Sequence, residues 1–350
     1  MIRTLTFLVL FLMAGYVIAQ NTAASPYSAS GLGERSFNGT QANRHMGGLD
    51  VFTDSIHVNL NNPASYGFSK VTTYSVGINY TNNNLSSSNE SQNSDVASID
   101  YISVSIPTGK FSFGFGLLPF TSVGYRVQGT NETSENQTFN RYEGNGGLNQ
   151  AYFSVGFPIT SYFAIGSTIN YNFGNLFYRT GQFLEGVDNG TFMSNESSVS
   201  GLSFQFSGQL KIPIQKKHTL QGMYSYQPTV GLDSRNSRIF STQSLSTEIL
   251  TDIVRIDLAS SGLENTNLDL SSMTRIGLGY GKNKKWFFGI QYNLIKSSNF
   301  ANEFFKRENI SYRNSEKWIV GGYFIPNYSS FTNFWSKVVY RFGLRTEQMS

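Results

Sequence analysis

From residue 71 onward, apolar and polar residues alternate along the chain in short stretches. In the clearest stretch, residues 202–212, even positions hold apolar residues or glycine and odd positions hold Ser, Gln or Lys. A period of two is typical of a β-strand whose two faces meet different surroundings. The pattern predicts eleven strands, at 71–80, 99–106, 111–117, 151–157, 163–173, 202–212, 220–226, 275–280, 286–294, 317–325 and 338–344.

The connections between these stretches are sorted by length. Short ones, such as 107–110, 158–161, 213–218 and 281–285, alternate with long Asn/Ser-rich ones at 81–98, 118–148, 174–201, 227–274 and 295–316. Outer-membrane barrels place short turns in the periplasm and long loops outside, whereas a soluble β-sandwich has no reason to sort its connections. The sequence therefore predicts an all-β protein, a transmembrane antiparallel β-barrel with long extracellular loops.

Composition narrows the class further. Charged residues make up 14% of the chain and aromatic residues 15%, and no apolar run after the N-terminus reaches the length of about 18 residues that a membrane helix needs. A multi-helix membrane protein is thereby excluded, and an alternating barrel remains. With no cysteine, the chain has neither disulfides nor thiolate sites, and a net charge of +4 is too weak to indicate a nucleic-acid partner.

The chain divides into three expected parts. Arg3, the apolar residues 5–13 and the small residues before Gln20 predict a signal peptide over residues 1–19, with a membrane-anchoring helix as the alternative. Residues 20–69 form a second part, and residues 70–350 form the barrel. Since bacterial barrels have an even number of strands, an eleven-strand count means either that one strand is not recognised or, as we favour, that further strands follow Ser350.

Residues 20–69 neither alternate nor show a helical period, and they are rich in glycine and asparagine. One interpretation is a disordered periplasmic tail. The other is a plug, or hatch, folded into the barrel lumen, where glycine permits close backbone approach and asparagine satisfies backbone groups.

Two short motifs in the hatch carry a family resemblance. They are Met46, Gly47 and Gly48 within residues 42–48, and Asn62, Pro63 and Ala64 just before the first strand. Together with the barrel that follows, they resemble the N-terminal hatch of the long-chain fatty-acid transporter (FadL-like) family of outer-membrane β-barrels. The resemblance implies a barrel of about 14 strands with a hatch, located in the bacterial outer membrane, that imports hydrophobic molecules.

The third strand carries a second point of resemblance. Its alternation is interrupted at Leu118, Pro119 and Phe120, and proline marks an edge or a bulge within a sheet. In the resembled family a kink in this strand opens a lateral hole in the barrel wall. Pro119 is therefore the expected kink, with Leu118 and Phe120 pointing into the lumen; the alternative is that Pro119 merely ends the strand.

Candidate chemistry points to binding rather than catalysis. No metal-ligand spacing, phosphate loop or nucleophile motif is present, so we expect neither an enzyme nor a cofactor. Inward arginines suit a carboxylate head group, and inward aromatic residues suit an apolar pocket. The predicted ligand-binding residues are Leu118, Phe120, Tyr101, Tyr152, Phe287, Arg275 and Arg341.

Two functions follow. The first is an outer-membrane channel for passive uptake of hydrophobic small molecules, such as long-chain fatty acids or aromatic hydrocarbons, with outer-membrane lipid and the small-molecule ligand as partners. The alternative is a non-catalytic barrel subunit of an outer-membrane secretion or barrel-assembly complex. For that role, residues 246–256, with the apolar Leu250, Ile253 and Val254, are a candidate docking element for protein partners.

Overall fold

The computed structural model describes residues 25–29, 31–86, 91–131, 137–214, 217–244, 249–299, 302–305 and 313–348. The predicted signal peptide, residues 1–19, lies outside the described residues. Within them, no helix has the length and apolar character required to cross a bilayer.

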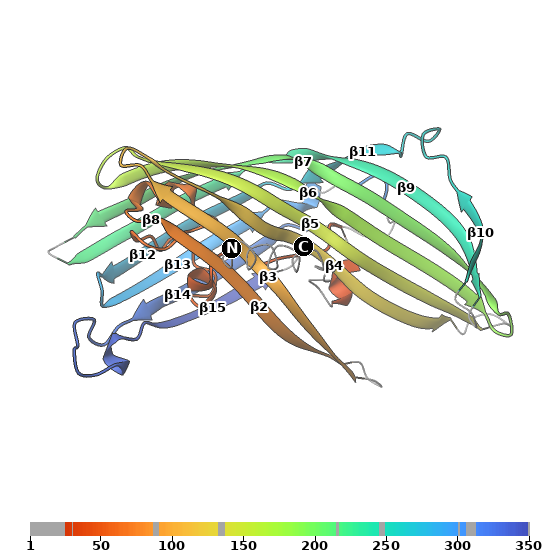
Figure 1. The fold of residues 1–350 in the computed structure, drawn as a ribbon, viewed down its shortest axis with the longest axis horizontal. Helices are drawn as coiled ribbons and strands as arrows, with labels where there is room; N and C mark the ends of the chain where they lie inside the picture. The colour runs from red at the N-terminus through yellow and green to blue at the C-terminus, as the bar shows by residue number, and fades with distance from the viewer. Residues whose placement is uncertain are drawn as a thin grey trace, which may run out of the picture.

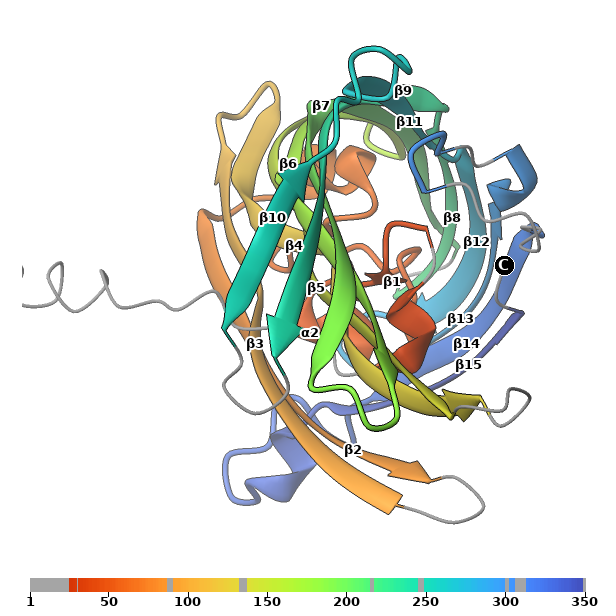
Figure 2. The same cartoon turned by 90° about the vertical axis from the view of Figure 1, so that its right-hand side faces the viewer.

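A wall of eleven antiparallel strands curves around a central space (Figures 1 and 2). Each strand pairs with the next along the order β2-β3-β4-β5-β6-β7-β8-β12-β13-β14-β15. This confirms the predicted all-β class and the eleven alternating stretches. The strands are β2 (Thr73–Ser86), β3 (Ser91–Pro107), β4 (Ser112–Asn131), β5 (Thr138–Pro158), β6 (Phe163–Leu184), β7 (Asn189–Pro213), β8 (His218–Gln227), β12 (Met273–Lys282), β13 (Trp286–Ile295), β14 (Ser315–Phe324) and β15 (Tyr340–Gln348).

The two faces of the wall differ as the alternation predicts. On β2, the side chains of Tyr74 and Ile78 point outward and are mostly exposed. On β7, Ser203 and Gln209 occupy inward positions of the alternation and are fully buried. An apolar outer face around a polar inner face is the arrangement of a lipid-embedded barrel. The wall therefore has an apolar outer surface and a polar inner surface.

Four of the five connections expected as long loops, at 81–98, 118–148, 174–201 and 227–274, consist mostly of strand, so that expectation was wrong for these four. Strands β4 to β7 are 20, 21, 22 and 25 residues long, whereas a membrane-spanning strand needs about 9–11. From their length we infer that these strands continue beyond the hydrocarbon core of a bilayer, where apolar residues are no longer required on the outer face. The 227–274 connection adds three further strands, namely β9 (Val230–Ser244), which pairs with β7, and β10 (Leu250–Arg255) and β11 (Asn265–Leu270), which both pair with β9.

The two ends of the barrel are consequently unlike. We call the end at which β3 connects to β4, β5 to β6, β7 to β8, β12 to β13 and β14 to β15 the short-turn end. The opposite end, toward which β4 to β7 and β9 extend, is the extended end. The extended end lies on the right of Figure 1. The loop rule for outer-membrane barrels predicts that the extended end faces outward and that the short-turn end faces the periplasm.

The described residues between 25 and 68 lie inside the wall (Figure 2). They contain four short elements, namely η2 (Pro26–Ala29), β1 (Glu34–Arg35), α2 (Gln41–Arg44) and η3 (Pro63–Phe68). Two more single turns, η4 (Ser297–Asn299) and η5 (Trp335–Lys337), lie in wall connections. We refer to residues 25–68 as the hatch.

Candidate functional site: the hatch, the lumen and the β3–β4 seam

Inward glutamines of the wall hold the hatch in place. The Gln221 side-chain oxygen accepts a hydrogen bond from the Thr53 backbone N–H at 2.7 Å, and the Gln209 oxygen accepts one from Asn62 Nδ2 at 2.6 Å. Gln291 acts on the hatch in the same way. These glutamines were not among the predicted site residues, although their inward position within alternating strands was the available signal. Much of the polar lining of the lumen therefore serves to bind the hatch.

The Asn-Pro-Ala motif docks the hatch onto the wall. Pro63 opens η3, and the Ala64 backbone N–H donates to Ser207 Oγ at 2.7 Å. Opposite them, a Cβ on Gly166 would overlap the backbone of Pro63, so only glycine allows this contact. The motif and the wall glycine together bring the two backbones into contact.

The Met-Gly-Gly motif makes a similar contact on the other side of the lumen. Met46 is fully buried, and Gly47 and Gly48 have φ angles of 75° and 96°, which L-residues with side chains rarely adopt. A Cβ on Gly343 of β15 would overlap the backbone of Met46 and Gly47. Both motifs thus hold the hatch by direct backbone packing.

Strands β3 and β4 separate partway up the wall. They pair only between residues 102–107 and 112–117. Above this point β4 stays with β5 while β3 continues with β2, and Figure 1 shows the two strands diverging. We call the gap between residues 91–101 of β3 and 118–131 of β4 the seam.

The hatch occupies the edge of β4 that faces the seam. Strand β1 pairs with Thr121 and Ser122, and the Ser36 backbone N–H donates to the Phe120 carbonyl oxygen at 3.0 Å. Further along, the Ser25 N–H donates to a β4 carbonyl at 2.9 Å. The guanidinium of Arg35 lies 5.3 Å from the centre of the Phe120 ring. Ser25 and residues 34–36 of the hatch therefore bond to the edge of β4 where β3 no longer pairs with it.

The predicted kink residue lies at this place. The pairing of β4 with β5 shifts register between Pro119 and Thr121, which leaves Phe120 as an extra residue in the strand. Leu118 and Phe120 on either side of the proline are both buried. Strand β4 nevertheless continues to Asn131, so Pro119 bends the strand without ending it.

Above the hatch, the inside of the extended end contains a buried apolar cluster. Phe120, Val123, Leu148 and Leu176 belong to one buried cluster, which the hatch residue Leu32 joins. The other members come from β6, β7, β9 and β11, namely Tyr178, Val199, Leu232, Leu268 and Leu270. We call this set the apolar cluster. Sequence reasoning missed most of it because these residues fall in stretches that looked like polar loops.

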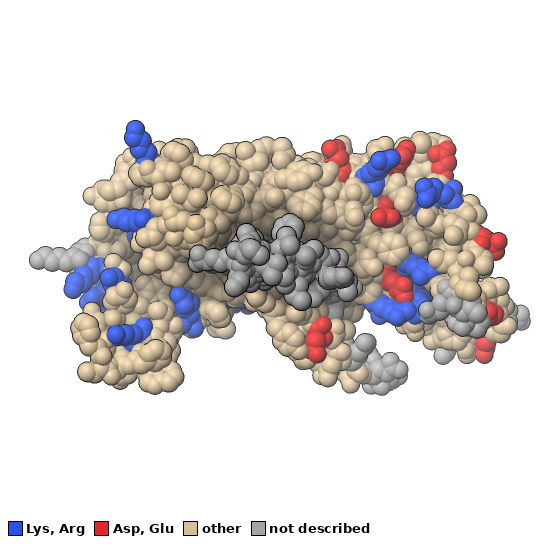
Figure 3. Space-filling model, in the orientation of Figure 1, with Lys and Arg blue, Asp and Glu red and all other residues tan. Residues whose placement is uncertain are grey.

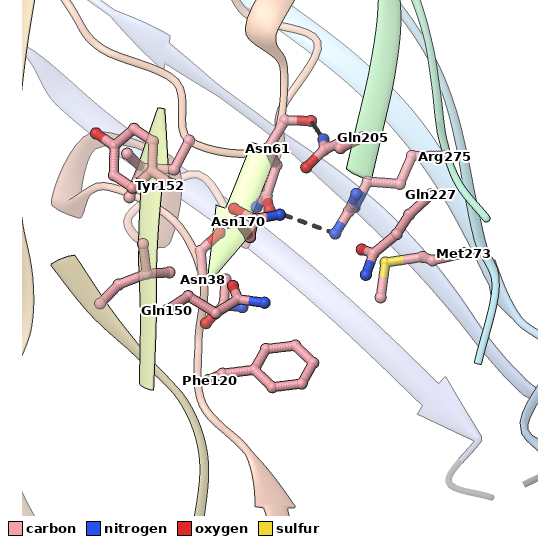
Figure 4. A pocket seen from close by; sticks show the side chains of 12 residues that line it. Asn38, Asn61, Phe120, Gln150, Tyr152, Asn170, Gln205, Gln227, Met273 and Arg275 are labelled. Carbon is pink, nitrogen blue, oxygen red and sulfur yellow. Dashed lines mark hydrogen bonds between the residues drawn. The ribbon is translucent and has the colours of Figure 1, made fainter. Parts of the chain in front are cut away.

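Beside Phe120, at the level of the hatch, lies a cavity of about 30 Å³. Figure 4 shows its lining, in which amide side chains alternate with a few apolar ones. The residues are Asn38, Leu60, Asn61, Leu118, Phe120, Gln150, Tyr152, Asn170, Gln205, Gln227, Met273 and Arg275. A volume of this size holds about two water molecules.

Four predicted ligand-binding residues meet at this cavity, and three do not. Leu118, Phe120, Tyr152 and Arg275 line it. Tyr101 instead accepts a hydrogen bond from the Gln41 backbone N–H, and Phe287 packs in a separate cluster with Met46 and Ile319. Arg341 lies on β15 beside the register position of Tyr323 and does not line the cavity.

Arg275 is the charged group of the cavity. Its Nη2 donates to Asn61 Oδ1 at 3.3 Å (Figure 4), while its buried Nη1 has no hydrogen-bond partner among the described residues. The carboxyl of the hatch residue Asp50 interacts electrostatically with Arg275. Burial raises the pKa of Asp50, and the positive charge of Arg275 and the hydrogen bond from Gln291 partly offset this increase. The site thus combines a buried guanidinium, which has one nitrogen without a hydrogen-bond partner among the described residues, with the carboxyl of Asp50 in its electrostatic environment.

In the described part of the chain, no three His, Asp or Glu side chains lie close enough to hold a metal ion. His57 contacts Asp54, with 2.6 Å between Nδ1 and Oδ2, and His218 contacts the hydroxyl of Tyr280. These histidines have structural partners within the hatch and the wall.

Comparison with solved structures gives the fold. The monoaromatic hydrocarbon channel CymD matches with a TM-score of 0.52 and 11% identity, over 91% of this chain and 85% of that one. The toluene transporter TodX of Pseudomonas putida gives 0.48 and 12% (91% and 85% covered). A FadL homologue of Pseudomonas aeruginosa gives 0.47 and 12% (82% and 76% covered). The expected likeness to the FadL-type barrels is confirmed at the level of the fold.

Comparison of the sequence identifies the family. No curated protein matches the chain. The sequence model of the BamG family matches residues 1–350, which is the whole length of the chain. The protein is a bacterial outer-membrane β-barrel, and the chain belongs to the BamG family.

Proposed function

We propose that this protein lets hydrophobic small molecules cross the outer membrane passively and releases them sideways through the seam. The observation that carries the proposal is the exchange of partners on β4, whose edge is paired with hatch residues 25–36 in place of β3. Wherever this edge lies in hydrocarbon its backbone groups must be satisfied, and here backbone groups of the hatch satisfy some of them.

The route runs from the extended end along the apolar cluster to Phe120. This part of the lumen offers a ligand apolar surroundings, while the polar hatch contacts lie below it. A drug-sized ligand needs a pocket of roughly 300 Å³ or more. Because the cavity at Phe120 measures about 30 Å³, the arrangement described here is closed, and passage requires residues 25–36 to move.

The energies permit such a movement. Each backbone hydrogen bond between the hatch segment and β4 contributes about 1 kcal/mol net. Burial of a hydrophobic chain contributes about 0.8 kcal/mol for each CH₂ group. A long-chain ligand therefore offsets the loss of the few contacts that close the seam.

Within this function, we propose carboxylate-bearing ligands, such as long-chain fatty acids, over neutral aromatic hydrocarbons. Support comes from Arg275, whose Nη1 is buried beside the cavity without a hydrogen-bond partner among the described residues. A guanidinium binds a carboxylate with two parallel hydrogen bonds. Arg275→Met should lower uptake of a fluorescent fatty acid about tenfold or more and leave uptake of a neutral tracer unchanged; equal effects on both tracers would remove the carboxylate preference.

A reversible lock tests the lateral route. Glu34 and Ser122 face each other in the β1–β4 pairing, and the chain has no cysteine of its own. In proteoliposomes of the full chain, oxidised E34C/S122C should take up a hydrophobic tracer slowly, and a reductant should restore the rate. A disulfide variant in the β2–β3 pairing, T73C/S105C, is the matched control. Equal uptake by oxidised and reduced E34C/S122C would contradict the proposal.

A second candidate function is a non-catalytic barrel subunit in a larger outer-membrane complex. The observation that favours it is β10 at the extended end, which pairs only with β9 among the described strands and exposes all six of its residues. Its apolar residues Leu250, Ile253 and Val254 lie beyond the expected lipid level, where exposed apolar side chains indicate a protein interface.

This candidate has a separate test. The wild type and I253K/V254K should be purified in mild detergent from the native membrane and compared by size. A large complex that the double substitution dissociates, with tracer uptake unchanged, would support the subunit role. A single barrel in both samples would exclude it.

A further inference from the structure

The short-turn end of the barrel has an unusual charge distribution. Its turns, taken as residues 107–112, 158–163, 213–218, 282–286 and 324–340, contain seven lysines and no Asp, Glu or Arg. Carboxylates gather toward the extended end, for example Glu185 and Asp188 between β6 and β7. Figure 3 shows the same separation, with blue side chains alone at the left end and red ones toward the right.

These lysines form a ring and not a single patch. Lys110 follows β3, Lys217 follows β7, Lys285 follows β12 and Lys337 precedes β15, so the charge is spread over most of the wall. Just above them the outer face carries exposed aromatic residues, such as Phe157. Aromatic side chains at the ends of barrel strands mark the level of the lipid head groups.

The turn at 325–339 adds an apolar element to this ring. It exposes Phe331, Phe334 and Trp335 by 95%, 74% and 68%. Internal hydrogen bonds nevertheless order it, including one from the Asn327 N–H to the Ser336 carbonyl oxygen at 2.8 Å. Figure 1 shows it (dark blue, lower left) standing away from the wall. We call residues 325–339 the aromatic turn.

We propose that the short-turn end binds anionic phospholipid head groups, with the lysines contacting lipid phosphates and the aromatic turn inserted at the boundary of head groups and acyl chains. Lysines near an anionic surface attract it, and aromatic rings prefer the membrane interface. The encircling distribution favours lipid over an acidic protein, because lipid surrounds the whole barrel whereas a protein would contact one side. The inference is independent of transport through the seam.

A lipid-binding experiment tests it. The full chain is placed in nanodiscs of phosphatidylcholine mixed with phosphatidylglycerol, and the phosphatidylglycerol retained on the barrel is measured by native mass spectrometry. K110Q/K285Q/K337Q should weaken retention about fivefold for each lysine removed. The control is K296Q, which removes an exposed lysine beyond β13 at the extended end.

The aromatic turn is tested separately. In a W286F/W318F background Trp335 is the one tryptophan left, and its fluorescence should be quenched by brominated lipid. Absence of quenching would overturn the insertion. Equal lipid retention by K110Q/K285Q/K337Q and K296Q would overturn the lipid site. The lipid site would also be overturned if the triple variant released a bound protein while its lipid retention stayed unchanged.

Discussion

At the scale of single residues, buried hydrogen bonds between amide side chains hold the hatch in the lumen. Gln209 and Asn62 are both fully buried and bonded to each other at 2.6 Å. Gln209→Ala leaves Asn62 buried without this partner, so we expect a loss of about 1–3 kcal/mol in unfolding free energy. Urea unfolding in detergent measures it. Gln128→Ala, at an exposed position of β4, should change nothing, and equal losses would contradict the role given to Gln209.

Asp50 makes the stability of the hatch depend on pH. Its pKa is raised above the ordinary value of 3.8, chiefly by burial, so the folded protein binds this proton more tightly than the unfolded chain does. Its contribution to stability is therefore full below pH 3.8 and is lost as the pH rises through the folded-state pKa. The urea midpoint of Asp50→Asn should therefore fall less between acid and neutral pH than the urea midpoint of the wild type. An identical pH profile in the variant would show that Asp50 does not titrate there.

At the scale of elements, the sequence predicted the wall strands inside the bilayer but not their extensions. In lipid, every outward residue must be apolar, so β2 and the lower part of β7 alternate plainly. Beyond the lipid, the outward face meets water, and Ser198 alternates with inward Val199 in a stretch that looks like a loop. For this reason the sequence pattern did not predict the apolar cluster. The partner exchange on β4 was not predictable either, because pairing depends on chain segments far apart in sequence.

The hatch segment at the seam yields a prediction for uptake. Leu32 anchors residues 25–36 in the apolar cluster beside Val123 and Leu148. Leu32→Asp buries a carboxylate without a partner, at a cost of several kcal/mol, so the segment should leave its place and tracer uptake should rise. Leu32→Met, which keeps an apolar side chain, should behave as wild type. Lower uptake in Leu32→Asp would mean that Leu32 lines the route and does not close it.

At the scale of the whole molecule, the protein is a lipid-embedded wall of strands whose interior is occupied by the hatch and by the apolar cluster. The hatch fills the short-turn half through both polar and apolar contacts, and the apolar cluster lies in the extended half. A wall whose backbone bonds lie between strands resists detergent, so we expect the folded chain to migrate faster on unheated gels than after boiling, and to fractionate with the outer membrane. A soluble, helical circular dichroism spectrum would contradict the whole architecture.

The central claim is that a hydrophobic molecule passes along the apolar cluster to the seam. Photolabelling with a diazirine-bearing fatty acid, followed by mass spectrometry of the labelled peptides, tests it most directly. The predicted result is labelling of residues 118–123 and of Leu148 or Leu176, which excess unlabelled fatty acid abolishes and which the oxidised E34C/S122C lock increases by trapping the ligand behind the seam. Labelling confined to outward residues such as Val76 and Phe206, unaffected by competitor, would contradict the account.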